Sequence, residues 1–222
     1  MRLQTPARLI AGTVLLLSPA GALGQGTFQN LNFEQSIIVS SSPSGYGFDT
    51  GTANVPGWTE YNGWGDANYP GGTTLDYNSE TLDAAGIALE GTAYWRPAIA
   101  GNYSIFLEGG SIPSSQYGTN GAAIGQTGQI PATAKSISFY GSSFYAMVTF
   151  NGQLLSFSTI GNGQNYTVYG ADISTYAGQT GELLFHALWP GGGGMIDNIR
   201  FSNLPIPEPG VFGLSALAAC RA

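Results

Sequence analysis

The chain has 222 residues, of which 34 are glycine, and only 9% of its residues are charged while 43% are hydrophobic. So little charge excludes an ordinary soluble helical protein, and 12% aromatic residues exclude a disordered chain, which leaves an all-β domain with a Ser, Thr, Asn and Gly surface. The net charge of −7, with Lys135 as the single lysine, also excludes nucleic acid as a partner, because no basic face can form.

The first 24 residues have the pattern of a secretory signal peptide. Arg2 and Arg8 precede an apolar run over residues 9–17, and small residues follow as far as Gly24. The alternative is a buried N-terminal helix, but the run is shorter than the ~20 residues of a membrane span and Pro19 would break a helix. We therefore expect cleavage between Gly24 and Gln25, and export of the protein.

Segments with alternating apolar residues, separated by Gly and Asn clusters, recur from residue 28 to residue 202. They predict strands at 28–33, 86–89, 103–107, 122–127, 136–140, 181–188 and 195–201, with one helical turn over 172–177. Short strands with turn signals between them are typical of sandwiches and barrels. We expect a single jelly-roll-like antiparallel β-sandwich over residues 25–204.

The clearest local signal is a hairpin around Asn151-Gly152. This dipeptide stands between two alternating runs, at 145–150 and 153–157, and both positions of a type I′ turn require positive φ. A two-residue loop pairs Phe150 with Gln153, Val148 with Leu155 and Ala146 with Phe157.

Aromatic residues gather in a Gly-, Asn- and Pro-rich stretch that the pattern predicts to be a loop. Rings on loops stack against sugars, so Trp64, Asp66 and Tyr69 are candidate carbohydrate-binding residues. The alternative is that such rings belong to the core, which applies most to Trp58 and Trp95 because large aromatic side chains are mostly buried.

Few residues point to catalysis. His186, the single histidine, lies in an apolar run that is typical of a buried strand, so we expect a structural role for it. The glycines at 191–194 predict a loop before the last strand, without the Lys-Ser/Thr of a phosphate-binding loop. A glycosidase needs only two facing carboxylates. The candidates are Glu60, Asp66, Asp76, Glu80, Glu90 and Glu108.

Asp197 has the same strand parity as Ile199 and Phe201, so alternation directs its carboxylate toward the core. A buried carboxylate must be paired or must bind a metal ion. One interpretation is that Asp197 pairs with Arg96 or caps a turn.

The chain ends in a proline-rich stretch, an apolar segment over 210–220 and Arg221. With Pro207, Glu208 and Pro209, residues 205–222 resemble the PEP-CTERM sorting signal of Gram-negative bacteria. The resemblance implies an exosortase-type membrane enzyme as partner, cleavage near the triplet and transient membrane contact through the tail. Here the tail is shortened, because a helix over 210–220 is only ~16 Å long while the hydrocarbon core is ~30 Å thick.

The body is similar to galactose-binding-like domains and to jelly-roll carbohydrate-binding modules. The residues that carry this similarity are 30–34 (Asn-Leu-Asn-Phe-Glu), 56–58 (Pro-Gly-Trp) and 194–199 (Gly-Met-Ile-Asp-Asn-Ile). The resemblance implies that Glu34 and Asp197 share one structural calcium ion, with carbonyl oxygens completing the shell. The alternative is that Glu34 is solvated.

Together these patterns predict an exported, non-catalytic protein of the cell envelope, outer surface or extracellular matrix, which is sorted through its PEP motif and binds exopolysaccharide. One alternative is a secreted carbohydrate-active enzyme that uses paired carboxylates. Another is a purely structural envelope protein with no ligand.

Overall fold

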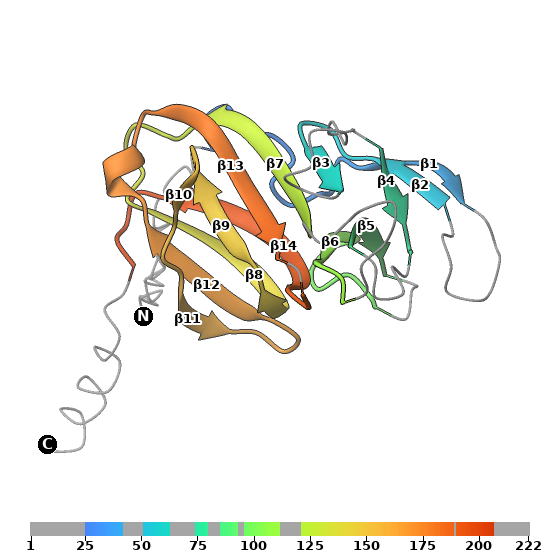
Figure 1. Ribbon diagram of the computed structural model, residues 1–222. Coiled ribbons are helices and arrows are strands. Elements are labelled where there is room, and N and C mark those ends of the chain that lie inside the picture. Colours follow the sequence, from blue (N-terminus) through green and yellow to red (C-terminus); the bar gives the residue numbers. More distant parts are fainter. Residues whose placement is uncertain are drawn as a thin grey trace, which may run out of the picture.

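The computed structural model of the chain describes residues 25–41, 51–62, 74–79, 85–92, 96–111, 121–188 and 190–206. Within these ranges the protein is all-β, with two sheets and one short 3₁₀ helix, Ser174–Tyr176 (Figure 1). The predicted signal peptide and the tail from Pro207 onward lie outside the described residues. In the part of the chain that is described, no helix has the length and hydropathy to cross a membrane.

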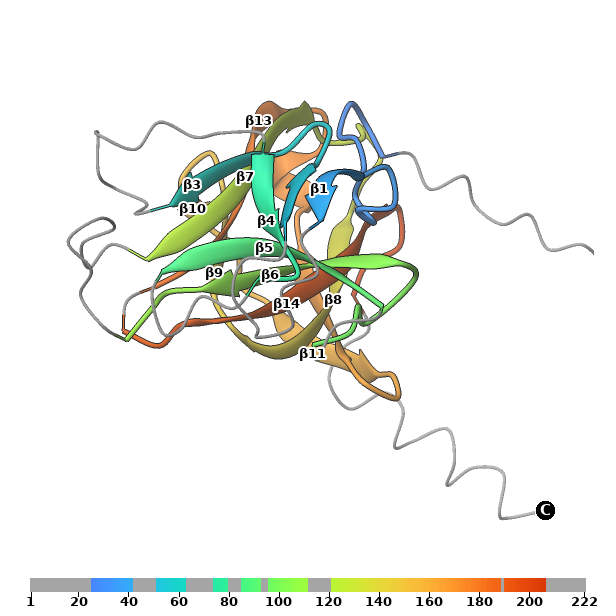
Figure 2. The ribbon, with the colours of Figure 1, turned by 90° about the vertical axis from the view of Figure 1, so that its right-hand side faces the viewer.

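The larger sheet has nine strands in the order β1-β2-β4-β5-β6-β14-β8-β12-β11. Its strands are β1 (Ile37–Ser41), β2 (Gly51–Asn54), β4 (Thr74–Tyr77), β5 (Gly86–Gly91), β6 (Tyr103–Glu108), β14 (Gly193–Ser202), β8 (Ser136–Tyr145), β12 (Thr167–Asp172) and β11 (Ser158–Asn162). Figure 2 shows β14, the last strand in the sequence, lying between β6 and β8. The expected antiparallel pairing holds for this sheet except between β4 and β5, where Asp76 lies beside Ala88 in a parallel pair.

The smaller sheet has five strands in the order β10-β9-β13-β7-β3. They are β10 (Gln153–Leu154), β9 (Met147–Phe150), β13 (Thr180–Ala187), β7 (Ala122–Gln129) and β3 (Thr59–Asn62). In Figure 1 this sheet lies across the part of the larger sheet that contains β8, β12 and β14. Phe185 of β13 meets Phe139 of β8 edge to face at 5.3 Å between ring centroids, so the two sheets pack face to face as the layers of a sandwich.

Trp58 is the largest side chain of the core, with 1% of its surface exposed. Its ring lies 5.4 Å from Phe33 and 6.4 Å from Phe185, and its indole Nε1–H donates to the carbonyl of Asn30 at 3.1 Å. A buried indole N–H needs such a partner. Trp58 is therefore a core ring, as one of the two interpretations predicted, while Trp95 lies outside the described residues.

Strands are confirmed at each of the ranges predicted at 86–89, 103–107, 122–127, 136–140, 181–188 and 195–201, and a helical turn is confirmed within 172–177. Several strands are longer than predicted, most of all β8, which continues to Tyr145. The strand predicted at 28–33 is wrong. This segment forms successive turns, with Asn30 at φ 48° and Phe33 at φ 58°. The Phe33 N–H donates to the Asn30 carbonyl at 3.1 Å, and the Gln35 N–H donates to the Asn30 side chain at 2.9 Å. Its apolar side chains are buried by these turns and not by strand alternation.

The hairpin is confirmed at its turn. Asn151 and Gly152 both have positive φ, at 49° and 73°, and Phe150 pairs with Gln153. The Leu155 N–H donates to the Val148 carbonyl at 2.9 Å, which continues the predicted register. The ladder ends before the expected pair of Ala146 and Phe157, because β10 stops at Leu154.

Candidate functional site

Glu34 lies in the turn directly before β1 and binds the loop that leads into β6. Its carboxylate accepts hydrogen bonds from the backbone and side-chain N–H groups of Asn102, each at 2.8 Å, and from the Tyr103 N–H at 3.2 Å. Gly101 has φ +61°, and a Cβ on it would lie 2.2 Å from Glu34 Oε1. Glu34 is thus half-buried against this loop and is not simply solvated.

Asp197 of β14 is buried, with 1% of its surface exposed. Its carboxylate accepts hydrogen bonds from the Ser104 hydroxyl at 3.0 Å, from the Asn198 N–H at 2.5 Å and from the Ala100 backbone. Burial raises the pKa of Asp197 to about 7, and the negative charge of Glu34 also raises it, although the hydrogen bonds act in the opposite direction.

A break in the alternation of β14 places Asp197 in this environment. Ile196, Ile199 and Phe201 all belong to the hydrophobic core, although Ile196 and Ile199 are separated by an odd number of positions. Asn198 has φ 53°, and the register with β8 shifts between Asp197 and Arg200. Asp197 is buried, as expected. Its carboxylate lies next to Ser104 and Glu34, and the regular alternation that would place it on the same face as Ile199 is broken.

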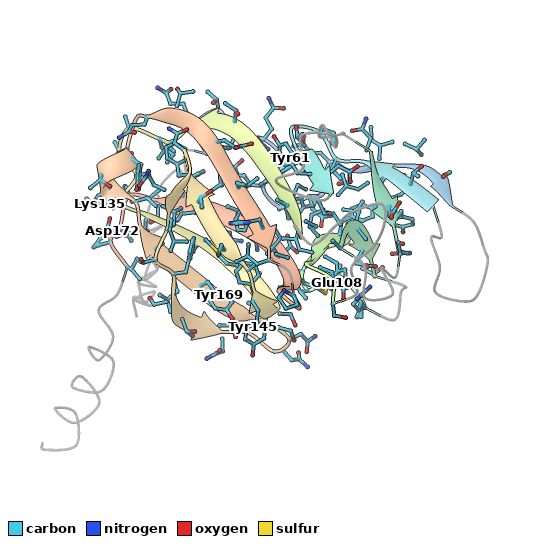
Figure 3. All side chains as sticks on the ribbon, viewed as in Figure 1. Tyr61, Glu108, Lys135, Tyr145, Tyr169 and Asp172 are labelled. Atoms are coloured by element: carbon cyan, nitrogen blue, oxygen red, sulfur yellow. The ribbon has the colours of Figure 1, made fainter. Side chains whose placement is uncertain are left out.

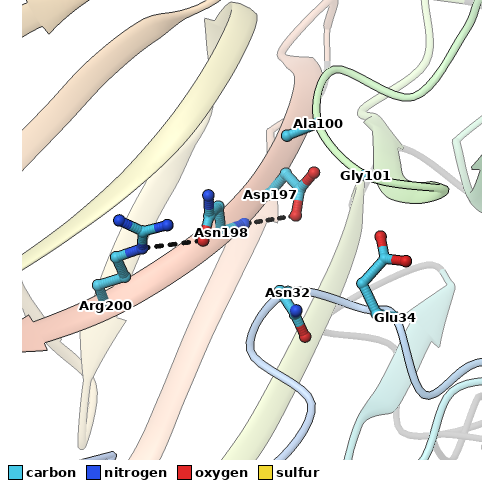
Figure 4. A pocket seen from close by; sticks show the side chains of 7 residues that line it. All are labelled: Asn32, Glu34, Ala100, Gly101, Asp197, Asn198 and Arg200. Atoms are coloured by element: carbon cyan, nitrogen blue, oxygen red, sulfur yellow. Dashed lines mark hydrogen bonds between the residues drawn. The ribbon is translucent and has the colours of Figure 1, made fainter. Parts of the chain in front are cut away.

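The two carboxylates converge on one pocket of about 220 Å³. The pocket is lined by Asn32, Glu34, Ala100, Gly101, Asp197, Asn198 and Arg200. Figure 4 shows the 100–101 segment beside both carboxylates and Arg200 at the other end, where its Nε–H donates to Asn198 Oδ1 at 2.9 Å. Arg96 does not pair with Asp197 but lies 3.6 Å from Glu90.

The chemistry of this pocket fits a hard cation. In the described ranges no three His, Cys, Asp or Glu side chains gather into a metal-binding group, so the described residues offer two carboxylates here. Asn32 and Asn198 also line the pocket, and Asn198 Oδ1 accepts the hydrogen bond from Arg200. The hydrogen-bond donors to both carboxylates are neutral. A calcium ion accepts this mixture of carboxylate, amide, carbonyl and water oxygens, and would neutralise the buried charge.

The other candidates from the sequence are not brought to this pocket. Trp64, Asp66 and Tyr69 lie outside the described residues. His186 is buried in β13, and burial lowers its pKa, which favours the neutral ring of a structural histidine.

Among the carboxylates considered for catalysis, Glu60 of β3 has a raised pKa. Burial raises its pKa to about 7, and the negative charge of Asp76 raises it further. Glu90 is buried beside Arg96, and Asp66 and Glu80 lie outside the described residues.

Sequence reasoning missed the 100–102 segment, Ser104 and Arg200. The Gly101-Asn102 dipeptide is a turn signal directly before a predicted strand, and it is the only local feature that indicated this loop. Comparison of the chain with family models, curated proteins and solved structures found no match.

Proposed function

We propose that this chain is an exported, non-catalytic protein of the cell surface or extracellular matrix, with a jelly-roll-like sandwich that binds extracellular polysaccharide. In this proposal the signal peptide over 1–24 directs export, and an exosortase-type enzyme sorts the protein at Pro207, Glu208 and Pro209. The signal-peptide pattern and the PEP pattern at the two ends of the sequence support export and sorting. The all-β sandwich supports a jelly-roll-like domain between them.

One observation carries the proposal furthest: Glu34 and Asp197 line the same pocket. They come from opposite ends of the domain, and the resemblance to jelly-roll carbohydrate-binding modules implied that these two residues share a calcium ion. Asp197 is buried and all its hydrogen-bond donors are neutral, so a bound Ca²⁺ would relieve the cost of its charge. In this role calcium ties the turn before β1 to β14 and stabilises the sandwich.

The cation is tested by thermal melting of protein produced from the full chain, in excess EDTA and in millimolar CaCl₂ at pH 8. We expect a higher melting temperature with Ca²⁺, because an ion that binds only the folded state stabilises it. Glu34→Gln and Asp197→Asn should abolish the response to Ca²⁺. The matched control Glu182→Gln removes a carboxylate of β13 that does not line the pocket and should keep the response. An unchanged melt in EDTA contradicts the calcium site.

Polysaccharide binding is tested on a glycan array, with hydrolysis assayed on every glycan that is bound. Binding without product release is the expected result. The absence of binding to any glycan would favour the purely structural alternative.

Glu60 supports a second candidate, a carbohydrate-active enzyme. A carboxyl group whose pKa is raised to about 7 holds its proton near neutral pH, as a general acid requires, and Asp76 is a second carboxylate close enough to affect it. Product release that is lost in Glu60→Gln would replace the non-catalytic proposal. Product release that persists in this variant would remove Glu60 as the acid.

A further inference from the structure

A second pocket of about 210 Å³ lies where β14 begins, on a part of the molecule that the proposed cation site does not use. It is lined by Phe106, Leu107, Glu108, Ser143, Tyr145 and the glycines at 191–194. Gly193 and Gly194 belong to β14, so the predicted loop is confined to residues 191 and 192. Three adjacent strands of the larger sheet, β6, β14 and β8, thus supply the pocket.

The register of these strands gives the pocket its shape. Gly193 lies opposite Glu108 of β6 on one side and opposite Tyr145 of β8 on the other. Residues directly opposite one another in antiparallel strands project from the same face, so Glu108 and Tyr145 stand two strand spacings apart, about 10 Å, with no side chain between them. Figure 3 labels both residues at the end of the molecule where β8 ends and β14 begins.

The floor of the pocket is backbone that excludes side chains. A Cβ on Gly192 would lie 2.6 Å from the Leu188 carbonyl oxygen, and a Cβ on Gly194 would lie 2.5 Å from the Ser143 carbonyl oxygen. The Gly191 N–H donates to the Gly110 carbonyl at 2.8 Å, and this hydrogen bond also holds the glycine segment in place. Glycine is therefore needed at residues 192 and 194 for the close approach of main chains.

The walls of the pocket combine one exposed ring with polar groups. Tyr145 has 79% of its surface exposed, which is unusual for a large aromatic side chain. Glu108 faces it across the glycine floor, and Ser143 adds a hydroxyl group. Phe106 is fixed beneath Arg96, whose guanidinium carbon lies 3.5 Å from the ring centroid.

We propose that this pocket binds one neutral hexopyranose unit of a polysaccharide. Tyr145 stacks on the C–H face of the sugar ring, and Glu108 accepts hydrogen bonds from its hydroxyl groups. The volume is below the ~300 Å³ of pockets for drug-sized ligands, so it admits a single ring. Glu108 and the net charge of −7 disfavour anionic sugars. The inference rests on the polysaccharide binding proposed above, and it names the ring class and the contacts.

The experiment measures binding of protein produced from the full chain to dextran, mannan, galactan and cellohexaose, with alginate as the anionic comparison. We expect binding to at least one neutral glycan and not to alginate. Tyr145→Ala should weaken that binding about tenfold through the loss of ring stacking. Tyr145→Phe keeps the ring and should bind more tightly than Tyr145→Ala. Glu108→Gln should weaken binding to a smaller extent.

Tyr166→Ala is the matched control, because it removes another tyrosine ring from the surface of the same sheet without touching this pocket. It should bind as the unmodified protein does, and equal melting temperatures show that the variants are folded. If Tyr145→Ala binds as tightly as the unmodified protein, the pocket assignment is overturned while polysaccharide binding stands. Binding to alginate alone overturns the neutral class, and binding to none of the five glycans overturns both the pocket and the proposed function.

Discussion

The two pockets on β14 are built in opposite ways. At Asp197 the strand carries a buried carboxylate, and the pocket is made by side chains and their hydrogen bonds to a neighbouring loop. At Gly193 the strand carries no side chain, and the pocket is made by closely packed backbone beneath an exposed ring. The first pocket should therefore respond to pH and cations, whereas the second should respond to the addition of a single methyl group.

The largest expected difference is in pH dependence. The folded-state pKa of Asp197, about 7, lies above its ordinary value of 3.8, so between these pH values the folded protein keeps a proton that the unfolded chain has released. Stability is then full below about pH 4 and falls as pH rises to about 7, by about 4 kcal/mol for this group in EDTA. Urea unfolding across this range measures the loss.

Asp197→Asn should flatten much of this dependence. In what remains, the raised pKa of Glu60 acts with the same sign, whereas the lowered pKa of His186 acts in the opposite direction. Ca²⁺ should restore stability chiefly above pH 6, where Asp197 is otherwise charged or becoming charged. If the unmodified protein and Asp197→Asn change in stability equally between pH 4 and pH 7 in EDTA, the pKa of Asp197 is not raised.

The second pocket is tested by two glycines that share positive φ but differ in their surroundings. Gly194→Ala forces a Cβ to within 2.5 Å of the Ser143 carbonyl oxygen and should cost about 3 kcal/mol. Gly191→Ala meets no atom within 4 Å and should cost only about 1 kcal/mol, for its backbone conformation. Denaturant unfolding of both variants gives the comparison, and equal costs would show that close packing does not form the floor.

An effect as small as that of Gly191→Ala is expected at Gly101, in the first pocket. A Cβ there meets Glu34 Oε1, which is the end of a flexible side chain, so Glu34 can move away. Gly101→Ala should cost about 1 kcal/mol, mainly for the positive φ. The shift of Glu34 should also weaken Ca²⁺ binding, as a calcium titration followed by the melting temperature would show. Unchanged Ca²⁺ binding would mean that Glu34 does not hold the ion.

The elements of the fold that could be predicted are those whose structure local sequence patterns determine. Asn151-Gly152 fixes its hairpin through backbone conformation, and the apolar strands of the core alternate regularly. The sequence reasoning missed β1, β2, β3, β4, β11 and β12. Two of these strands, β2 and β11, consist largely of Gly, Ser, Thr and Asn, which alternate too weakly to be detected. At residues 28–33 a long-range contact determines the structure instead of local alternation, because the indole N–H of the buried Trp58 donates to the carbonyl of Asn30 in a turn.

For the candidate site, the resemblance to known modules led to Glu34 and Asp197, which the fold does bring together. Their partners could not be predicted. Ser104 is an ordinary strand residue in the sequence, and its role depends on the break in alternation at Asn198. The second pocket could not be predicted for a similar reason. A run of glycines in the sequence indicates only a loop, and the strand register is needed to place Glu108 and Tyr145 on either side of it.

The central position of β14 also bears on how the chain folds. Without β14 the nine-stranded sheet falls into two separate pieces, with β6 at the edge of one and β8 at the edge of the other. The sheet therefore closes only when residues 193–202 become available, after every other strand has emerged from the ribosome. Such non-local pairing is slow, in the range of milliseconds to seconds for β-rich domains. The larger sheet therefore stays incomplete until β14 has been synthesised.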